Sequence, residues 1–356
     1  MTDVSEIIEH ADALPDGIQK VRLYEKAIQI ADNKKDDELA WRLRLDFIPV
    51  CSDGGCPDRM LVAFSWCLAY YDKSPEDFEV TEILWYYKWV LNALCNFPNI
   101  SKEKIFELLN DFEERSKSEN FSPRTVHYIK SKIYRGLKDF KLMSEELKQC
   151  FSMPRDDMSD CEACEQHYAF YNAYNEDNYD EALKLADPIM SGELSCRSVP
   201  HTTLPYILLI NQSKSIDSRQ LFHKAFRMIK GKPIFLANYL DISLYLLKDN
   251  DLTKAWEIID QSLIKATEST DPSVKFYYYT AAVLVYSCID KSKRLFKYKL
   301  PSIKAFGEHE KSYKAIAKIL KSERDQLAKA FDKRNGNSYY RNKTKTLDDF
   351  VKSYQD

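Results

Sequence analysis

Four residues of this chain have side chains and spacings suited to holding a metal ion. Cys161 and Cys164 form a C-x2-C pair, and Cys196 and His201 form a C-x4-H pair. Thiolate sulfur and imidazole nitrogen are favoured ligands of zinc, which takes four of them in a closed tetrahedron at structural sites. The sequence therefore predicts a structural Zn2+ site of the Cys3His type on these four residues.

Other interpretations of the same residues stay open. Buried cysteines are common in protein cores, and His201 could cap a helix instead. A C-x2-C pair is also typical of redox sites, but those need a strand followed by a helix, a context that this region lacks. A catalytic zinc would need an open fourth position.

Helices must position these residues, because apolar side chains recur with helical spacing almost throughout the chain and strand-like alternation is rare. The sequence predicts an all-α fold of about fifteen helices, separated by short breaks that Pro, Gly, Asn or Asp often mark. Their approximate ranges are 19–32, 37–50, 59–72, 80–95, 101–116, 124–136, 139–150, 163–175, 179–190, 204–213, 217–229, 234–248, 252–266, 273–289 and 310–332. Short helices with short turns imply antiparallel pairs stacked in sequence.

A repeated pattern is visible where several of these helices begin. One helix opens with NYDEALKLA and another with DLTKAWEII, and their alanines, Ala182 and Ala255, lie 73 residues apart, about two periods of 36. This pattern resembles the second helix of a tetratricopeptide repeat (TPR), in which a large residue precedes a small one where two helices cross. The resemblance is clear at 164–190 and 236–266, fair at 17–50 and 203–230, and weak elsewhere.

The resemblance implies a right-handed α-solenoid of antiparallel helix hairpins with a C-terminal capping helix. Asp177 and Asn250 stand where the family pattern has Gly, so we expect degenerate repeats. A HEAT-like or unclassified helical solenoid is the alternative. The expected organisation is a repeat array over 1–290, a basic linker over 291–309, a capping helix over 310–333 and a polar tail over 334–356.

Alignment on Ala182 places the four metal-ligand candidates at one junction between repeats. Cys161 and Cys164 begin the first helix of one repeat, and Cys196 and His201 lie in the loop that enters the first helix of the next. Neighbouring first helices would run roughly parallel at about 8–10 Å. Two ligands from each could then converge on one ion.

The first helices of a TPR array line its concave face, which implies a binding surface here. In this chain they supply tyrosine and asparagine side chains that can grip an extended peptide: Tyr168, Tyr171, Asn172, Tyr174, Asn175, Asn211, Asn238 and Tyr239. The predicted function is a non-enzymatic scaffold that binds a protein or peptide on this face. The alternative is an intracellular peptide-sensing regulatory receptor that lacks a DNA-binding domain.

Composition lowers the expectation of several other functions. The eight glycines form no G-x-G-x-x-G motif or P-loop, and neither H-E-x-x-H nor G-x-S-x-G occurs, so we expect no enzyme. A net charge of −3 gives no overall field for nucleic acid, although residues 291–304 form a short basic stretch, which we interpret as a solvated linker.

Location is also an expectation from sequence. No stretch of 18 apolar residues suggests a membrane span, and the acidic N-terminal segment does not look like a secretory signal. Nine cysteines in such a chain are expected to be reduced thiols or metal ligands, so the predicted location is cytoplasmic. The sequence carries no prediction of oligomeric state.

Overall fold

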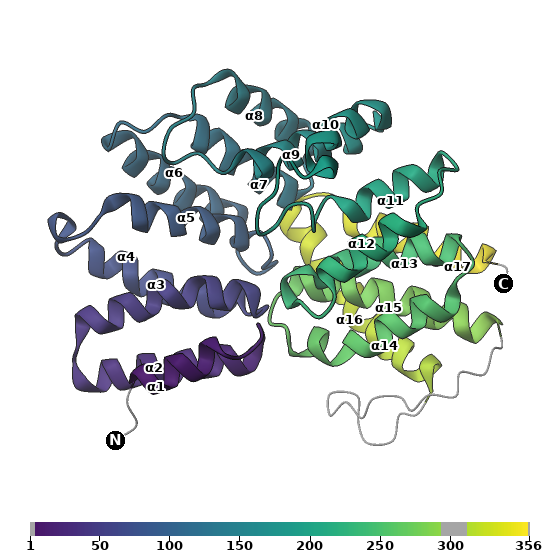
Figure 1. Cartoon of the computed structure of the whole chain (residues 1–356), viewed down its shortest axis with the longest axis horizontal. Coiled ribbons are helices and arrows are strands. Elements are labelled where there is room, and N and C mark those ends of the chain that lie inside the picture. Colours follow the sequence, from purple (N-terminus) through teal and green to yellow (C-terminus); the bar gives the residue numbers. More distant parts are fainter. Residues whose placement is uncertain (1–3, 293–311, 355–356) are drawn as a thin grey trace.

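The computed structural model describes residues 4–292 and 312–354, which form 17 α-helices, two short 3-10 helices and no strand (Figure 1). The α-helices are α1 (Val4–Asp12), α2 (Ile18–Lys34), α3 (Asp37–Asp53), α4 (Pro57–Tyr71), α5 (Val80–Leu94), α6 (Lys102–Ser118), α7 (Arg124–Leu137), α8 (Phe140–Ser152), α9 (Glu162–Asn175), α10 (Tyr179–Ser191), α11 (Leu204–Ser213), α12 (Arg219–Ile229), α13 (Tyr239–Lys248), α14 (Leu252–Glu268), α15 (Pro272–Ser292), α16 (Tyr313–Asn335) and α17 (Tyr339–Ser353). The 3-10 helices are η1 (Pro75–Asp77) and η2 (Pro233–Asn238). None of these helices combines the length and apolar character needed to cross a bilayer.

The all-α prediction is confirmed for the described residues, and every predicted helix has a counterpart there. Polar residues at the predicted breaks explain several of the helix starts. The side chains of Asn178 and Asp251 accept hydrogen bonds from the backbone N–H groups of Glu181 and Lys254, at 3.4 and 3.0 Å. These caps satisfy one of the free donors at the start of α10 and of α14.

The main difference from the sequence prediction lies at the end of the chain. Residues 334–356, expected as a polar tail, contain the helix α17. The Tyr340 ring packs against Phe276 and Phe331 with centroids 4.8 and 4.6 Å apart. The buried Asp332 carboxylate accepts hydrogen bonds from the backbone N–H groups of Tyr340 and Arg341. A few buried residues therefore fix a segment whose composition is mostly polar.

The segments predicted as a capping helix and as a basic linker differ in how much of them the structure describes. A helix, α16, lies where the sequence predicts the capping helix, and a further helix, α1, precedes the first predicted one. The predicted basic linker, 291–309, lies outside the described residues except for its first two positions.

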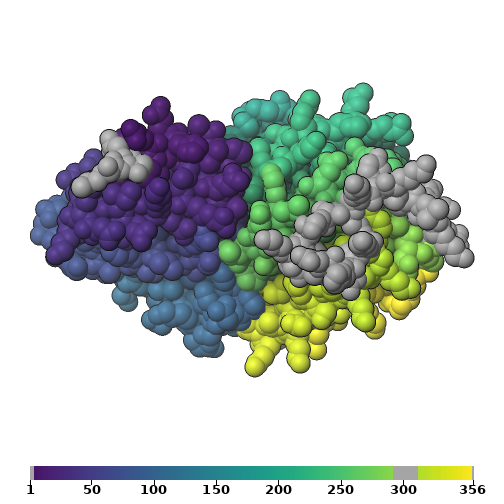
Figure 2. Space-filling model, turned by 90° about the horizontal axis from the view of Figure 1, so that it is seen from below, coloured from purple at the N-terminus to yellow at the C-terminus, as the bar shows by residue number. Residues whose placement is uncertain are grey.

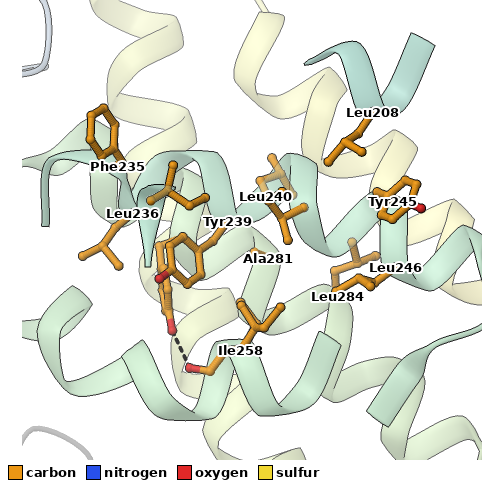
Figure 3. Close-up of a cluster of buried hydrophobic side chains, with 14 of the residues drawn as sticks. Leu208, Phe235, Leu236, Tyr239, Leu240, Tyr245, Leu246, Ile258, Ala281 and Leu284 are labelled. Atoms are coloured by element: carbon orange, nitrogen blue, oxygen red, sulfur yellow. Dashed lines mark hydrogen bonds between the residues drawn. The ribbon is translucent and has the colours of Figure 1, made fainter. Parts of the chain in front are cut away.

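Neighbouring helices pack pairwise along the chain around two large hydrophobic cores. Residues from 4 to 137, with Met158, form the first core, and residues from 128 to 354 form the second. Helix α7 belongs to both, because Ile129 lies in the first core and Tyr128 in the second. In the second core, side chains of η2 and α13 pack against α14 and α15. Leu236 of η2, Leu240 of α13 and Leu284 of α15 are examples (Figure 3).

The N-terminal helices meet the C-terminal helices at a loop contact. The backbone N–H of Thr270 and the hydroxyl of Ser269 both donate to the Gly55 carbonyl, each at 3.0 Å. Gly55 has a φ of +72°, and a Cβ atom there would lie 3.1 Å from the Pro233 side chain. Only glycine suits this position without strain. Seen from below, the two ends of the chain form adjoining lobes (Figure 2).

Further hydrogen bonds join residues far apart in sequence across the same boundary. The Asn96 amide donates to the buried Asp271 carboxylate at 2.7 Å. The Arg334 guanidinium donates to the Cys95 carbonyl at 2.8 Å, which ties α16 to the end of α5. The C-terminal helices therefore contact the N-terminal ones, and a partly open space remains between them.

Asp271 provides a pH test of this closure. Burial raises its pKa from 3.8 to about 6, against the hydrogen bonds from Val274, Ser273 and Asn96 that lower it. The folded state therefore disfavours the ionised carboxyl, so this group's contribution to stability falls as pH rises from about 4 to about 6. Between pH 4 and pH 6, the free energy of unfolding of the wild type should fall by up to roughly 3 kcal/mol relative to that of Asp271→Asn.

Urea unfolding at several pH values measures this difference. Asp249→Asn, at an exposed position of the same half, is the control and should show no such trend. A wild-type-to-Asp271→Asn difference that stays constant from pH 4 to pH 7 would contradict the buried hydrogen-bonded contact.

Candidate metal centre and interior cavity

Three of the four predicted metal ligands come together. The sulfur atoms of Cys161, Cys164 and Cys196 all lie within 4.8 Å of one another, and those of Cys164 and Cys196 are 3.4 Å apart. A disulfide would need about 2.05 Å. Three thiolates around one zinc at about 2.3 Å each would be about 3.8 Å apart. The cluster therefore has the donor type and approximate spacing of a thiolate metal site.

The local fold explains why these sulfurs converge. Cys161 is the N-cap residue of α9 and Cys164 lies in its first turn. Cys196 lies in the loop between α10 and α11, where its backbone N–H donates to the Val199 carbonyl at 2.8 Å. A small apolar cluster of Ala163, Ile189 and Val199 packs beneath the cysteines. The loop is thereby held against the start of α9.

His201 is not brought into this group. Its Nε2 atom lies 3.1 Å from the Lys232 ammonium nitrogen, and its ring stacks on Phe235 at 4.9 Å. Its Nδ1 atom is buried without a hydrogen-bond partner among the described residues. The structure therefore brings together three sulfur atoms that could bind a metal ion, and the imidazole predicted as the fourth ligand makes other contacts.

Protonation of the cluster matters because metals bind thiolates. The adjacent Cys164 side chain holds the pKa of the Cys196 thiol below its usual range, at about 5. The same contact raises the pKa of Cys164, and burial raises that of Cys161. Metal binding to the cluster would therefore release protons from sulfurs whose pKa is raised.

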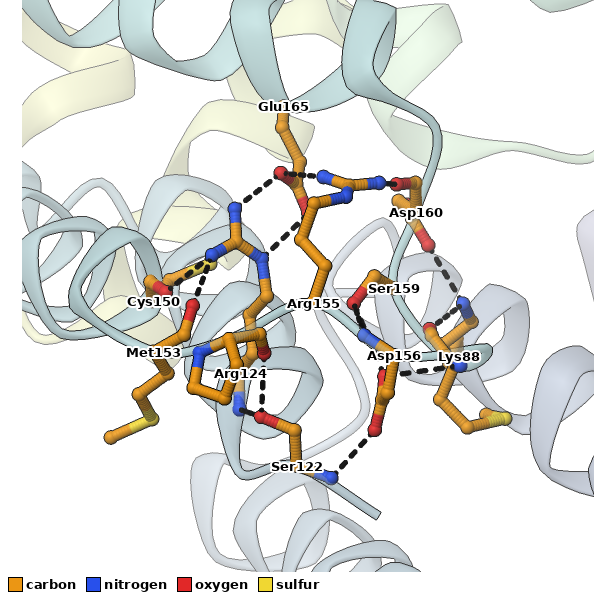
Figure 4. A network of polar contacts seen from close by, with 12 residues as sticks. Lys88, Ser122, Arg124, Cys150, Met153, Arg155, Asp156, Ser159, Asp160 and Glu165 are labelled. Carbon is orange, nitrogen blue, oxygen red and sulfur yellow. Dashed lines mark hydrogen bonds and ion pairs between the residues drawn. The ribbon is translucent and has the colours of Figure 1, made fainter.

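A network of buried charges fixes the segment just before Cys161 (Figure 4). The guanidinium of Arg124, from α7, pairs with Glu165 of α9 at 2.6 Å and donates to the Met153 carbonyl at 2.6 Å. Arg155 also pairs with Glu165 and donates to the Asp160 carbonyl at 2.5 Å. The extended chain between α8 and α9 is thus anchored at both ends.

Asp160, next to Cys161, joins this segment to two further helices. Its carboxylate pairs with Lys88 of α5 and Lys132 of α7, each at 2.8 Å. Burial alone would raise the pKa of Asp160, but Lys132 and Lys88 outweigh it and hold that pKa well below its usual range. The carboxylate therefore stays ionised and keeps both lysines paired.

The three cysteines line a cavity of about 520 Å3 between the N-terminal and C-terminal helices, here called the cysteine chamber. Its wall also includes Trp85 and Trp89, with Lys88 over the Trp85 ring at 3.5 Å. Arg197, next to Cys196, lies 5.3 Å from the Trp89 ring and pairs with Asp53. The candidate metal site thus forms part of an interior wall.

A second cavity of about 250 Å3, here called the tyrosine chamber, adjoins the first. The two share Asn92, Asn96, Lys132, Ala237 and Ser273 as lining residues. Seven tyrosines line the tyrosine chamber: Tyr168, Tyr171, Tyr174, Tyr206, Tyr277, Tyr339 and Tyr340. They come from α9, α11, α15 and α17, so the chamber exists only because the C-terminal helices fold back.

Five of the eight residues predicted for partner binding line the tyrosine chamber: Tyr168, Tyr171, Tyr174, Asn175 and Asn238. The other three do not line it. Asn172 donates to Ser144 and Glu176 between α8 and α9, and Tyr239 is buried in the second core. Asn211 lies half-buried on α11 away from both chambers.

Sequence reasoning missed the charged residues of this chamber. They include Arg135 and Lys138 at the end of α7, Asp241 on α13 and Lys343 on α17. Their only signal in the sequence is a charge at a helix end or on a polar helix face, which usually marks solvent. A search of protein-family models, curated proteins and solved structures finds no match to this chain.

The metal centre predicts unequal effects of two substitutions. Cys196→Ser should lower zinc content at least tenfold, because it removes a thiolate from the group. His201→Ala should keep most of the zinc, because His201 lies against Lys232 and Phe235. Elemental analysis of protein purified without chelator, with all cysteines reduced, measures both.

Two results would contradict this assignment. Wild-type protein with less than about a tenth of an equivalent of zinc would exclude a tightly held structural ion. Equal zinc loss in both variants would show that His201 rotates to become the fourth ligand.

Proposed function

We propose that this chain is a degenerate TPR-like α-solenoid, right-handed, that binds a short segment of polypeptide in the tyrosine chamber. It acts as a binding protein without catalytic turnover. A structural zinc ion on Cys161, Cys164 and Cys196 fixes one wall of the adjoining cysteine chamber. Of the two functions expected from sequence, this favours a peptide receptor over a scaffold for a large partner.

The observation that carries the proposal is the partly open, tyrosine-lined space between the two halves. Tyrosine combines a rigid apolar ring with a hydroxyl that donates and accepts hydrogen bonds. Asn175 and Asn238 add amides to the same wall. Such a lining suits the alternating polar and apolar groups of a peptide.

The size of the space supports a small ligand. The tyrosine chamber alone, of about 250 Å3, is slightly smaller than sites that bury drug-sized molecules, which span roughly 300–1,000 Å3. Together with the adjoining cysteine chamber of about 520 Å3, it falls within that range. A folded protein could not enter, although an extended end of one could. Hydrogen bonds such as that from Asn96 to Asp271 close the boundary around the space.

Zinc would act on the shape of this space. The start of α9 and the loop before α11 each contribute to the cluster, and both lead into helices that line the tyrosine chamber. An ion between them would fix the relative position of these helices. The chamber would then be preorganised for its ligand, which lowers the entropic cost of binding.

Affinity selection from a library of short peptides tests the proposal. Wild type should enrich a related set of sequences, identified by mass spectrometry. Tyr171→Phe with Tyr174→Phe removes two hydroxyls from the chamber lining and should weaken binding of that set roughly fivefold or more.

Asn172→Ala is the matched control, because it lies on the same helix but outside the chamber. It should leave the selected set and its affinities unchanged. No enrichment by wild type, or equal losses in the control and the tyrosine variant, would refute peptide binding in this chamber.

A further inference from the structure

Three basic side chains of the tyrosine chamber make no ion pair with any residue that the structure describes. They are Arg135 on α7, Lys138 at its C-cap and Lys343 on α17. Lys132 also lines the chamber, but it is paired with Asp160. We call Arg135, Lys138 and Lys343 the basic triad.

Aromatic rings are the main partners of the basic triad. Arg135 lies 4.3 Å from the Tyr171 ring centroid and donates to the Tyr168 hydroxyl at 3.0 Å. Lys138 lies 5.4 Å from the rings of Tyr339 and of Tyr340. Contacts of this kind supply only part of what a cation loses on leaving water. The triad therefore keeps uncompensated positive charge.

Asp241 is the only acidic residue among the described residues that line the chamber, and it offsets part of this charge. Burial raises the pKa of Asp241 to about 6, while Lys343 and Arg135 act to lower it. Even when it is ionised, this carboxylate faces Arg135, Lys343 and a Lys138 side chain that is only partly protonated near neutral pH. Burial, with Arg135 and Lys343 nearby, lowers the pKa of Lys138 to about 7, which reflects the cost of placing it there.

The end of α7 and the distant helix α17 together supply the triad. Lys138 is the C-cap residue of α7 in a left-handed conformation at φ 62°, as Lys35 is at the end of α2. Lys343 comes from a helix about two hundred positions further along the sequence. Buried like charges lower stability, and such local conflicts are expected where a protein binds something.

We propose that the basic triad is a binding site for an oxyanion, a carboxylate or phosphate group carried by the ligand of the tyrosine chamber. A guanidinium and two ammonium groups can donate charge-assisted hydrogen bonds to its oxygens. The proposal deepens the proposed function, since it rests on the same chamber and assigns the place where the ligand's negative end is held.

Thermal unfolding of the full chain in matched salts tests the site without a known peptide. Succinate, inorganic phosphate and chloride are compared at equal ionic strength. In wild type, succinate or phosphate should raise Tm by about 3 °C or more over chloride. Lys138→Gln and Lys343→Gln should each abolish most of that rise.

The same variants have a second signature. In chloride, each should melt at a temperature equal to or above that of wild type, because a repelling charge is gone. Lys352→Gln is the control, since Lys352 lies exposed on α17, the helix of Lys343, and pairs with Asp349. It should keep the full response to the anion.

Each outcome of the salt comparison supports or overturns the anion site. A response to succinate assigns a carboxylate ligand, a response to phosphate alone assigns a phosphate ester, and both support the site. No response, or an equal response in the triad variants, overturns it. Peptides that bind wild type and triad variants equally well would overturn the anion site but leave peptide binding intact. An anion response without peptide enrichment would support the anion site and overturn peptide binding.

Discussion

The arrangement of both chambers depends on one buried interaction, the carboxylate of Asp160 between the ammonium groups of Lys88 and Lys132. It joins α5, α7 and the segment that leads into α9. A buried charge costs several kcal/mol unless it is paired, so removing Asp160 would leave two uncompensated lysines. Its neighbour is Cys161, and one interaction therefore helps to position both the cavity wall and the first candidate metal ligand.

Charged side chains form ion pairs near the cysteines, whereas the basic triad of the tyrosine chamber forms none with the described residues. Near the cysteines, Arg124 and Arg155 share Glu165, and Lys88 and Lys132 share Asp160. In the tyrosine chamber, by contrast, the basic triad is offset mainly by aromatic rings and by Asp241. The proposed oxyanion of the chamber's ligand would supply negative charge next to the basic triad.

The sequence predicts the local features of this protein well and its long-range closure poorly. Helices α2 to α16 follow from apolar spacing and from caps such as Asn178 and Asp251, which act over a few residues. Helix α17 escapes prediction because one buried ring, Tyr340, and its contacts with Asp332 hold a polar segment. The cysteine spacing predicts three converging sulfurs, but not the contact of His201 with Lys232, since only the fold brings residue 232 near. Lys343 likewise reaches Arg135 through tertiary closure.

X-ray absorption at the zinc edge tests the central claim, that a metal ion ties α9 to the loop before α11 in the chamber wall. Protein purified in reducing buffer should show three sulfur neighbours at about 2.3 Å, with one lighter ligand from water or a side chain. In Cys196→Ser, any zinc that remains should have fewer sulfur neighbours. A spectrum with only nitrogen or oxygen neighbours, or an unchanged sulfur count in that variant, would contradict the metal centre.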